Sequence, residues 1–570
     1  MPVLRKRWRL PQEANAGFHA SLPDINPLVR QILYARGYTT PEAARTFLVG
    51  APDHPNPFDL PQMSLLVDRL RRAIRQQEEI AIYGDYDVDG ITALVVLART
   101  LRALGARVRP YIPHRMSEEY GLNRRALANL RQEGVRVILT VDCGIRSVDE
   151  IAYGRALGLD ILVTDHHSVP ETLPSAQAIV NPKLPGSRYP FCDLAGVGVA
   201  YRVAQALLRV ARRTARRNDP PLPVSEESFL DLVALGTVAD VVPLVGENRN
   251  LVRTGLVHLN RMDRPGLSAL CQVAGVSSGH IDSEQIAFRL APRLNATGRL
   301  DTALRACELL LTEDPSRAEA LARELHEINT ERQRLTEELH EQARATWLAE
   351  ASEGPLIFVA GPGYHKGIVG LVASRLTEEF YRPALVIEVD GDHCRGSARS
   401  IPEFNITAAL GECADLLQRY GGHAMAAGLT LETARLEELR ERLQAIAGER
   451  LREVELMPSL QIDAVCPLSD ASWETVRALD ELRPFGQGHA VPTCLSRNVL
   501  VRDARVVGER HLRLAVSDGR ATWEAIAFRQ AEALPDLPSR IDLAYNLEVN
   551  RWNGEARIQL IVQDLRPAGT

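Results

Sequence analysis

Three apolar runs in the first third of the chain each end in acidic or histidine residues, and a segment of helical character follows each run. The runs are residues 80–83, 135–141 and 161–164. Short apolar runs that alternate with helical segments are typical of βαβ units, whose strands form a parallel sheet. In an open α/β sheet the carboxyl ends of such strands converge on one crevice. The sequence therefore predicts an α/β fold with polar side chains gathered at one sheet edge.

Carboxylates dominate the segments that follow these runs. Residues 84–90 read GDYDVDG, residues 141–144 read VDCG and residues 164–168 read TDHHS, while Asp240 lies near the end of the apolar helical stretch 229–241. Carboxylates gathered in one crevice repel one another, and buried charge is tolerated only when it is paired or bound to a metal. Oxygen ligands with one or two histidines suit Mg²⁺ or Mn²⁺. The pattern predicts a two-metal hydrolytic site.

Each segment alone also has a simpler interpretation. A single aspartate after a strand is usually a helix N-cap, and this would be the first interpretation of Asp89 or Asp142 in isolation. A His-His pair is most often a surface pair or a packed pair. Capping does not account for three acidic residues that alternate over residues 85–89 without a basic neighbour. The occurrence of all four segments in this order therefore favours a metal site.

The order Asp-x-Asp, Asp, Asp-His-His, Asp resembles the motif order of the DHH phosphoesterase superfamily. Within it, the chain is similar to the RecJ family of single-strand-specific 5′→3′ DNA exonucleases, because further blocks match along nearly the whole chain. These blocks are YGLN (120–123), LAGVGVA (194–200), APRLNATGR (291–299), HKGIVG (365–370), GSARS (396–400), GGHAMAAG (421–428) and RPFGQG (483–488).

The resemblance implies two bound ions, Mn²⁺ or Mg²⁺, and a set of residues around them. The implied metal ligands are Asp85, Asp87, Asp89, Asp142, His166 and Asp240. Asp142 is expected to bridge the ions, and His167 either binds a metal or orients His166 and the scissile phosphate. Asp165 is expected to support the ligands or to cap a helix. The implied catalytic group is Asp87, Asp89, Asp142, His166, His167 and Asp240.

The resemblance also implies which residues hold a terminal 5′-phosphate. Arg115 lies just beyond the second strand, and Ser397 and Arg399 lie in what the sequence predicts to be a glycine-flanked turn of the second lobe. Arginine binds phosphate bidentately, so these residues are expected to clamp the phosphate. For any one of these arginines, a surface salt bridge is the alternative.

A second group of residues is expected to contact the DNA. Gly421 and Gly422 would let backbone N–H groups approach a phosphate, and His423 would then donate to one of its oxygens. A structural role is the alternative for His423. A further polar cluster that the resemblance assigns to substrate binding is Arg293, Asn295 and Arg299.

The expected fold is two α/β lobes, of DHH and DHHA1 type, joined by a long helix and followed by an OB-type β-barrel. Residues 316–350 contain no Gly or Pro, and a helix of this length spans roughly 50 Å. Several short strands after residue 455 suit a small barrel that binds single-stranded DNA. The expected domains are a lead-in (1–50) packed on the first lobe, a DHH catalytic domain (51–313), a connecting helix (314–352), a DHHA1-type substrate-binding domain (353–453) and an OB-fold domain (454–570).

Bulk properties narrow the class of protein. A chain of 570 residues is too long for one core and indicates roughly three or four domains. No apolar run approaches the roughly 20 residues of a membrane span. The start of the chain lacks the apolar stretch of a secretory signal, and the eight cysteines form no C-x-x-C pair. We therefore expect a cytoplasmic protein. The net charge of −6 neither supports nor excludes DNA as the substrate.

Rival functions share parts of this pattern. A DHH phosphoesterase that acts on short oligonucleotides or pAp would share the metal site but lack the long helix and the barrel. A cyclic-dinucleotide phosphodiesterase usually carries membrane and sensory segments, and a manganese pyrophosphatase would end after the second lobe. A catalytically silent replication factor would have lost metal ligands. The expected partner is single-stranded DNA, with a single-strand-binding protein and a helicase implied by the resemblance.

Overall fold

The computed structural model describes residues 6–50, 55–114, 118, 121–216, 220–351, 354–552 and 555–569. The chain divides into two compact units. The first unit, which we call the metal-site unit, comprises Val49–Arg332 and Arg483–Ala490. The second, which we call the C-terminal unit, comprises Met1–Leu48, Gln333–Leu482 and Val491–Thr570.

A parallel sheet forms the centre of the metal-site unit. Its strands are β2 (Glu79–Gly84), β3 (Arg107–Tyr111), β4 (Val135–Val141), β5 (Asp160–Thr164) and β6 (Ala178–Val180), in the order β3-β2-β4-β5-β6. Every neighbouring pair of these strands is parallel, so the predicted parallel α/β sheet is confirmed. Because β2, β4 and β5 are adjacent, the residues that follow them lie at the same edge of the sheet.

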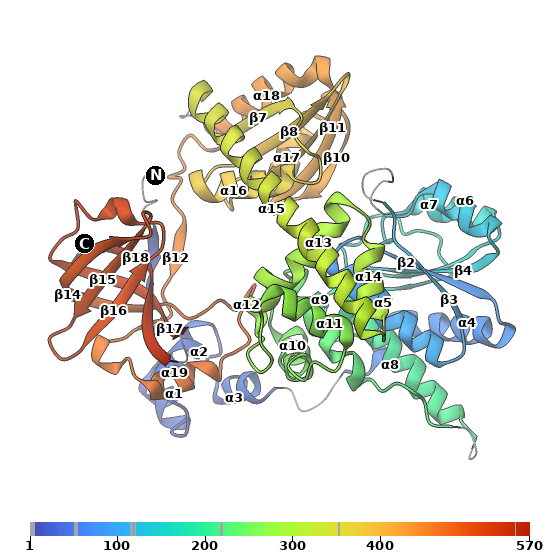
Figure 1. Cartoon of the computed structure of the whole chain (residues 1–570), viewed down its shortest axis with the longest axis horizontal. Helices are drawn as coiled ribbons and strands as arrows, with labels where there is room; N and C mark the ends of the chain where they lie inside the picture. The colour runs from blue at the N-terminus through green and yellow to red at the C-terminus, as the bar shows by residue number, and fades with distance from the viewer. Residues whose placement is uncertain are drawn as a thin grey trace. The chain divides into compact units, whose positions relative to one another are not determined.

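Helices cover both faces of this sheet (Figure 1). Alternate residues of a strand point to opposite faces, so Ile82 and Leu139 join one apolar cluster while Tyr83 and Ile138 join the other. The helices α4 (Met63–Gln76), α5 (Val88–Ala103) and α8 (Gly196–Thr214) pack on the first face, and α6 (Arg124–Gln132) and α7 (Val148–Ala156) pack on the second. Burial on both faces explains why these strands are almost continuously apolar.

Further helices extend the first apolar cluster beyond the sheet. They are α9 (Leu230–Ala239), α10 (Gly246–Leu259), α11 (Pro265–Ala274), α13 (Ala291–Leu300) and α14 (Leu304–Leu311). The next helix, α15 (Pro315–Ala351), is 37 residues long and starts in the metal-site unit and ends in the C-terminal unit. The long helix predicted from the absence of Gly and Pro is confirmed.

The C-terminal unit contains a mixed α/β sheet. Its strands are β7 (Ile357–Pro362), β8 (Ala384–Asp390), β9 (His393–Arg399), β10 (Leu417–His423) and β11 (Ala426–Glu432), in the order β10-β11-β9-β8-β7. Of these neighbouring pairs, only β7 and β8 are parallel. Helix α16 (Val369–Phe380) packs against β8 and β9, whereas α17 (Ile406–Gly411) and α18 (Leu436–Arg450) share an apolar cluster with alternate residues of the strands.

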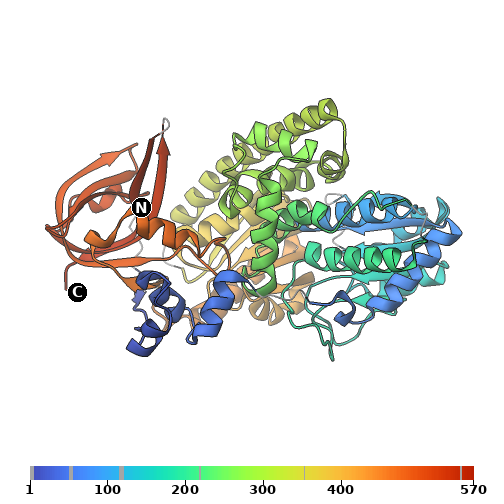
Figure 2. The ribbon, with the colours of Figure 1, turned by 90° about the horizontal axis from the view of Figure 1, so that it is seen from below.

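Five strands close into a barrel near the end of the chain. They are β14 (Cys494–Val507), β15 (His511–Ser517), β16 (Thr522–Ala527), β17 (Arg540–Trp552) and β18 (Glu555–Pro567). The order β14-β15-β16-β18-β17 is closed by the pairing of β14 with β17. These strands are the red arrows of Figure 1, seen from below in Figure 2. The predicted OB-type barrel is confirmed.

Most of the N-terminal segment, up to Leu48, belongs to the unit that contains the barrel, so the expectation that it packs on the first lobe is wrong for this part. Strand β1 (Arg7–Arg9) pairs in parallel with β12 (Ser459–Gln461). The indole of Trp8 donates a hydrogen bond of 2.7 Å to the Asp564 carboxylate. Arg36 forms an ion pair with Asp463 at 2.8 Å. These contacts join residues more than 400 positions apart in the sequence, which local sequence patterns cannot reveal. The end of the segment does contact the first lobe, where the Val49 carbonyl accepts a hydrogen bond from Arg253.

The segment Arg483–Ala490 belongs to the metal-site unit, although it lies within the range expected for the barrel domain. The Leu244 amide donates to the Gln487 carbonyl at 2.7 Å, and the Ser283 hydroxyl donates to the Phe485 carbonyl at 2.6 Å. The RPFGQG block is therefore hydrogen-bonded to the loop that follows Asp240 and to Ser283.

Candidate metal centre

The predicted acidic and histidine residues meet at the carboxyl edge of the parallel sheet. Asp85, Asp87 and Asp89 follow β2, Asp142 follows β4, and His166 and His167 follow β5, while Asp240 ends α9. Their ligand atoms form three groups, each with all atoms within 4.8 Å of one another. The groups are Asp85–Asp87–Asp142, Asp142–His166–His167 and Asp89–His166–Asp240.

His166 lies at the centre of the cluster. Its Nε2 atom is 3.1 Å from Oδ1 of Asp142, 3.7 Å from Oδ2 of Asp240 and 3.9 Å from Oδ2 of Asp89. Asp142 and His166 each belong to two of the three groups. The cluster thus offers neighbouring cation positions that these two residues link.

Four buried polar atoms of the cluster have no hydrogen-bond partner within the described part of the chain. They are Oδ1 of Asp142, both ring nitrogens of His166 and Oδ2 of Asp240. Buried polar atoms are almost always satisfied, by protein, by water or by an ion. Two carboxylate oxygens and an imidazole nitrogen directed at one space fit a hard divalent cation with some affinity for nitrogen. The residues therefore fit Mg²⁺ or Mn²⁺.

Electrostatics in the ion-free cluster are unfavourable for charged carboxylates. Burial, and then the charge of Asp89, raise the pKa of Asp240 to about 10. Burial, and then the charge of Asp87, raise the pKa of Asp89 to about 7, against hydrogen bonds that lower it. Burial and the neighbouring carboxylates also hold the pKa of Asp142 well above its usual range. A bound divalent cation favours the charged form of each carboxylate and so opposes these shifts.

The two histidines differ in protonation. Burial, and then His167, lower the pKa of His166 to about 3, so His166 is neutral and able to bind a metal. Burial also lowers the pKa of His167, but its hydrogen bond to Asp165 and the surrounding carboxylates outweigh burial and leave that pKa raised. Nδ1 of His167 lies 2.7 Å from Oδ1 of Asp165, whose other oxygen accepts the Ile145 amide at 2.9 Å. The prediction that Asp165 is a supporting residue agrees with these contacts.

Two carboxylates of the first acidic segment accept backbone hydrogen bonds. Asp87 is the N-cap of α5 and accepts the Gly90 amide at 3.1 Å, while Asp85 accepts the Tyr86 amide at 2.7 Å. A carboxylate has about four acceptor positions, so one backbone bond leaves others for a cation. The sequence suggested capping as the simpler interpretation for Asp89 and Asp142 and not for Asp87, which caps α5 and still has room for a role as a ligand.

The polar residues of block 291–299 lie beside the first acidic segment. Asn295 accepts the Val88 amide at 3.0 Å, which ties α13 to the start of α5. Arg293 donates to the Arg289 carbonyl at 2.6 Å and to Nδ1 of His326 at 3.2 Å, and Arg299 is half-buried on the same helix. Asn295 thus supports the metal-binding loop directly. Contact of these three residues with DNA stays a prediction. Arg115 lies outside the described residues.

The substrate residues predicted in the C-terminal unit lie on strands, so the predicted glycine-flanked turn is wrong. Ser397 and Arg399 belong to β9, and Gly421, Gly422 and His423 belong to β10. Antiparallel pairing with β11 overrides the local preference of the glycines for a turn.

Cross-strand register nevertheless brings most of these residues to one sheet face. Gly428 of β11 pairs with both Ser397 and Gly421, and Ala426 pairs with both Arg399 and His423. Gly422 lies between Gly421 and His423 on β10, so it is on the opposite face of the sheet. A Cβ atom at Gly370, in the first turn of α16, would lie 3.0 Å from Oγ of Ser397 and 3.3 Å from Arg399. The start of a helix therefore adjoins Ser397 and Arg399.

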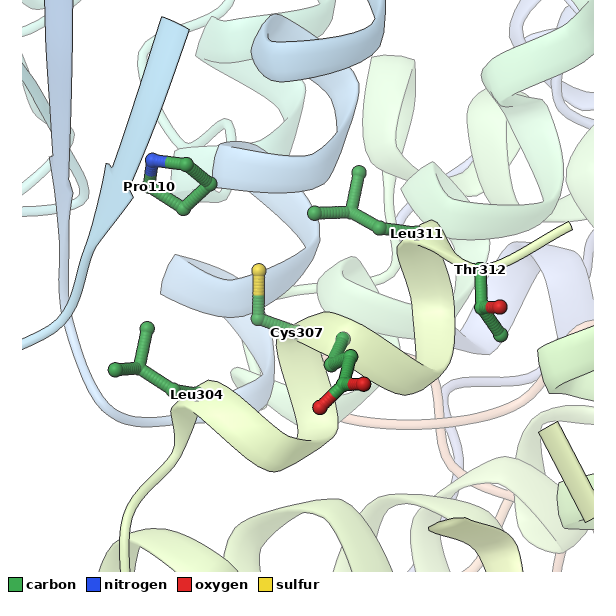
Figure 3. Close-up of a pocket in the computed structure, with 6 residues that line it drawn as sticks. Pro110, Leu304, Cys307, Leu311 and Thr312 are labelled. Carbon is green, nitrogen blue, oxygen red and sulfur yellow. The ribbon is translucent and has the colours of Figure 1, made fainter. Parts of the chain in front are cut away.

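A surface pocket of about 440 Å³ lies elsewhere in the metal-site unit, between β3 and α14 (Figure 3). Its lining is Pro110, Leu304, Cys307, Glu308, Leu311 and Thr312, and none of these residues is a candidate ligand. Burial raises the pKa of the Cys307 thiol to about 12, so this cysteine is not a nucleophile at neutral pH. The pocket does not contribute to the metal centre.

Sequence reasoning missed the direct role of the glycine-rich block 194–200. The amides of Gly196 and Val197 donate to the Asp89 carboxylate at 2.6 Å and 2.8 Å. A glycine-rich segment that opens a helix is a recognisable anion-binding pattern, and this signal was present in the sequence.

Among the described residues, no helix is both long enough and apolar enough to cross a bilayer.

Comparisons with known proteins cover the whole chain. Three family models match: DHH family, N-terminal domain, over residues 79–237; DHHA1 domain over 353–449; and RecJ OB domain over 462–564. The single-stranded-DNA-specific exonuclease RecJ of Bacillus subtilis is 40% identical over 99% of this chain and 71% of its own length. The protein of the same name from Escherichia coli is 34% identical over 96% of this chain and 97% of its own length.

Solved structures agree with the sequence comparisons. The crystal structure of RecJ from Thermus thermophilus in complex with Mn²⁺ matches with a TM-score of 0.85 and 30% identity, over 99% of this chain and 80% of that one. The complex of the same protein with Mg²⁺ matches with a TM-score of 0.78. The three domain types, their order and the identity over nearly the full length show that this chain belongs to the RecJ family.

Proposed function

We propose that this protein is a metal-dependent exonuclease that degrades single-stranded DNA from the 5′ end and releases 5′-mononucleotides, in DNA repair and recombination. The observation that carries the proposal is the cluster in which Asp142, Asp240 and His166 direct unpartnered atoms into one space. Members of the family named as single-stranded-DNA-specific exonucleases share the full domain order.

Each residue of the cluster has a defined task in this proposal. Asp85, Asp87 and Asp142 would hold one divalent ion, and Asp89, His166 and Asp240 would hold the other. Two bound ions would supply an activated water, neutralise the phosphoryl group and stabilise the leaving oxygen. His167, whose pKa is raised and whose Nδ1 is engaged by Asp165, donates a hydrogen bond to the scissile phosphate. The site needs no separate general base.

Recognition of the 5′ end rests on the face formed by β9 and β10. Ser397, Arg399 and His423 place a hydroxyl, a guanidinium and an imidazole on one side of the sheet. Ser397 and Arg399 also adjoin the first turn of α16. A helix N-terminus and an arginine both favour a phosphate dianion. Arg115, Gly421, Gly422, Arg293, Asn295 and Arg299 complete the set of residues that we propose for substrate binding.

The barrel would extend the binding track for a single strand. OB-type barrels combine basic grooves with aromatic side chains on which bases stack. Two aromatic side chains here are well exposed, Trp473 at 42% and Phe528 at 51%, whereas Phe485 and Tyr545 are buried. We further propose that a single-strand-binding protein and a helicase supply and present the DNA in the cytoplasm. The domain limits proposed are 51–313, 314–352, 353–453 and 454–570, with a lead-in over residues 1–50. Residues 483–490, within the last range, belong to the metal-site unit.

Digestion of a single strand labelled at either end tests this function directly. We expect Mn²⁺- or Mg²⁺-dependent release of mononucleotides from the 5′ end, and far slower turnover of duplex DNA, inorganic pyrophosphate, pAp and a cyclic dinucleotide. Preferred hydrolysis of pAp or a cyclic dinucleotide would instead support the alternative, a small-substrate DHH phosphodiesterase. Strand binding without any hydrolysis would indicate a silent replication factor, which the complete ligand set argues against.

A further inference from the structure

The carboxylate of Asp89 lies against the N-terminus of a second helix. Asp89 is in the first turn of α5, and both of its oxygens accept backbone amides from the start of α8. Gly196 donates to Oδ2 at 2.6 Å and Val197 donates to Oδ1 at 2.8 Å. Since a carboxylate offers about four acceptor positions, two of them stay available to a cation. Asp89 is thus held in one orientation before any ion binds.

Helix α8 has no cap of its own. Ala195 is its N-cap residue, and this side chain makes no capping hydrogen bond. The first amides of a helix are left without intrahelical partners and attract negative charge. Asp89 satisfies two of them from 107 residues away in the sequence, and the two helices pack together through the apolar cluster on one face of the sheet.

The same glycine also contacts a second candidate ligand, Asp142. A Cβ atom at Gly196 would lie 2.7 Å from Cβ, 2.8 Å from Oδ1 and 2.9 Å from Cγ of Asp142. Contacts this short are not tolerated, so any larger residue would displace Asp142. Asp142 has little room to adjust, because it is buried and its backbone is in the left-handed region with φ = 61°. Gly196 is therefore in contact with both Asp89 and Asp142.

We propose that Gly196 and the Val197 amide are positioning groups of the metal centre: the start of α8 fixes the orientation of Asp89 and the place of Asp142, and so sets the affinity for the divalent ions. This inference rests on the proposed metal-dependent function and names residues of that site which touch neither the substrate nor the ions. The simpler alternative is that Asp89 is only a remote helix cap. A pure cap would affect stability and leave metal affinity unchanged.

Substitution of Gly196, with a matched control in the same helix, separates these possibilities. In Gly196→Ala the new methyl group meets the Asp142 carboxylate, whereas in Gly198→Ala it meets only the flexible end of Leu194 at 3.2 Å. Loss of a group that orients a metal ligand typically lowers metal affinity about 10–100-fold. We expect that loss in Gly196→Ala by titration of the full-length protein with Mn²⁺, followed by calorimetry or by the electron paramagnetic resonance signal of the ion. Gly198→Ala should bind Mn²⁺ with the same affinity as the unaltered chain.

A second measurement covers the case in which Gly196→Ala does not fold. Hydrogen–deuterium exchange of a peptide over residues 194–200 reports the two amides directly. Asp89→Ala should accelerate exchange in this peptide and leave a peptide over residues 124–132, on the other face of the sheet, unchanged. Equal Mn²⁺ affinity in folded Gly196→Ala and the unaltered chain, or unchanged exchange in Asp89→Ala, would overturn the proposal. If the unaltered chain binds Mn²⁺ but does not cleave DNA, the proposed function fails and the positioning role stands.

Discussion

Nδ1 of His167 donates a hydrogen bond of 2.7 Å to Oδ1 of Asp165. Asp165 is buried and also accepts the amides of His166, His167 and Ile145, so its carboxylate is fixed in place. Burial raises the pKa of Asp165, but the hydrogen bond and the charge of His167 outweigh it and bring the pKa to about 2. The pair therefore holds the ring of His167 in one orientation, with Nε2 as its remaining nitrogen.

Asp165→Asn should impair catalysis through His167 while leaving the metal centre in place. The amide cannot stabilise a protonated His167, so we expect kcat to fall roughly 10–100-fold, as for other groups that orient a ligand or catalytic side chain. Affinity for Mn²⁺ should change far less. His167→Ala should reduce kcat at least as much, and in that background Asp165→Asn should add little. Additive losses in the double variant would show that the two residues act separately.

Asp142 is a non-glycine residue in the left-handed backbone region. Asparagine tolerates this conformation better than alanine does, so Asp142→Asn removes the charge with the least strain. We expect it to abolish hydrolysis and to raise the melting temperature of the ion-free protein, because one buried, repelled carboxylate is gone. Adding Mn²⁺ should then stabilise the variant less than the unaltered chain. Near-normal, metal-dependent turnover would show that Asp142 is not a ligand.

Asp87→Ala and His166→Ala should also abolish hydrolysis and leave a folded protein. His166 contributes a neutral ring whose Nε2 makes no hydrogen bond within the described residues, so its loss removes a ligand and no structural bond. Asp87 in addition caps α5, and losing an N-cap costs about 1 kcal/mol of stability. Without metal, Asp87→Ala should therefore have a lower melting temperature than His166→Ala. Retained activity in either variant would contradict the ligand assignment.

Exposed aromatic side chains of the barrel region offer a cleaner test than truncation. Removing everything after Glu455 would weaken binding to long strands, but it would also remove Arg483–Ala490 from the metal-site unit and β12 from β1. Trp473→Ala with Phe528→Ala should lower affinity for long strands by about 1–3 kcal/mol per stacked base and spare hydrolysis of dinucleotides. Val506→Ala, at an exposed apolar residue without a ring, is the matched control. Equal losses on long and short substrates would contradict the role in stacking.

The positions of Asp85, Asp87, Asp142 and His166 could be predicted because these residues follow strands of one parallel sheet. Once β2, β4 and β5 are adjacent and parallel, the residues after each strand share one edge, whatever the packing of the helices. Asp240 ends α9, so its position follows from the family resemblance and not from strand topology. The contact between Asp89 and Gly196 could not be predicted in the same way. It depends on how α5 and α8 pack, and that packing is set by many apolar side chains with no local signature.

Errors in the prediction arose where distant pairing overrode local preference. The glycine at position 396 is unfavourable for a strand locally, yet β9 pairs along its length with both β8 and β11. The N-terminal segment reads as a short lead-in, and its contacts with β12, Asp463 and Asp564 place most of it in the C-terminal unit. In both cases the deciding hydrogen bonds come from another part of the chain.

Polarity of digestion provides the last prediction. Ser397 and Arg399 share the face of β9 that adjoins the first turn of α16, and we propose that they bind the terminal 5′-phosphate. Arg399→Ala should raise KM and erase the preference for a 5′-phosphate over a 5′-hydroxyl, at roughly 1.5–3 kcal/mol for a lost charged hydrogen bond. Arg399→Lys should recover part of this preference, because lysine keeps the charge but not the bidentate geometry. Arg115→Ala should act in the same direction as Arg399→Ala.

Arg395→Ala is the matched control, since Arg395 is an exposed arginine of the same strand, and its position four residues from Arg399 puts it on the same face. It should leave the 5′-phosphate preference unchanged. The measurement is the release of mononucleotides from strands labelled at either end, with and without a 5′-phosphate. Digestion that starts at the 3′ end would disprove the proposed polarity. A preference retained in both Arg399→Ala and Arg115→Ala would place the phosphate site elsewhere, because removing a bidentate donor from a phosphate cannot leave its recognition intact.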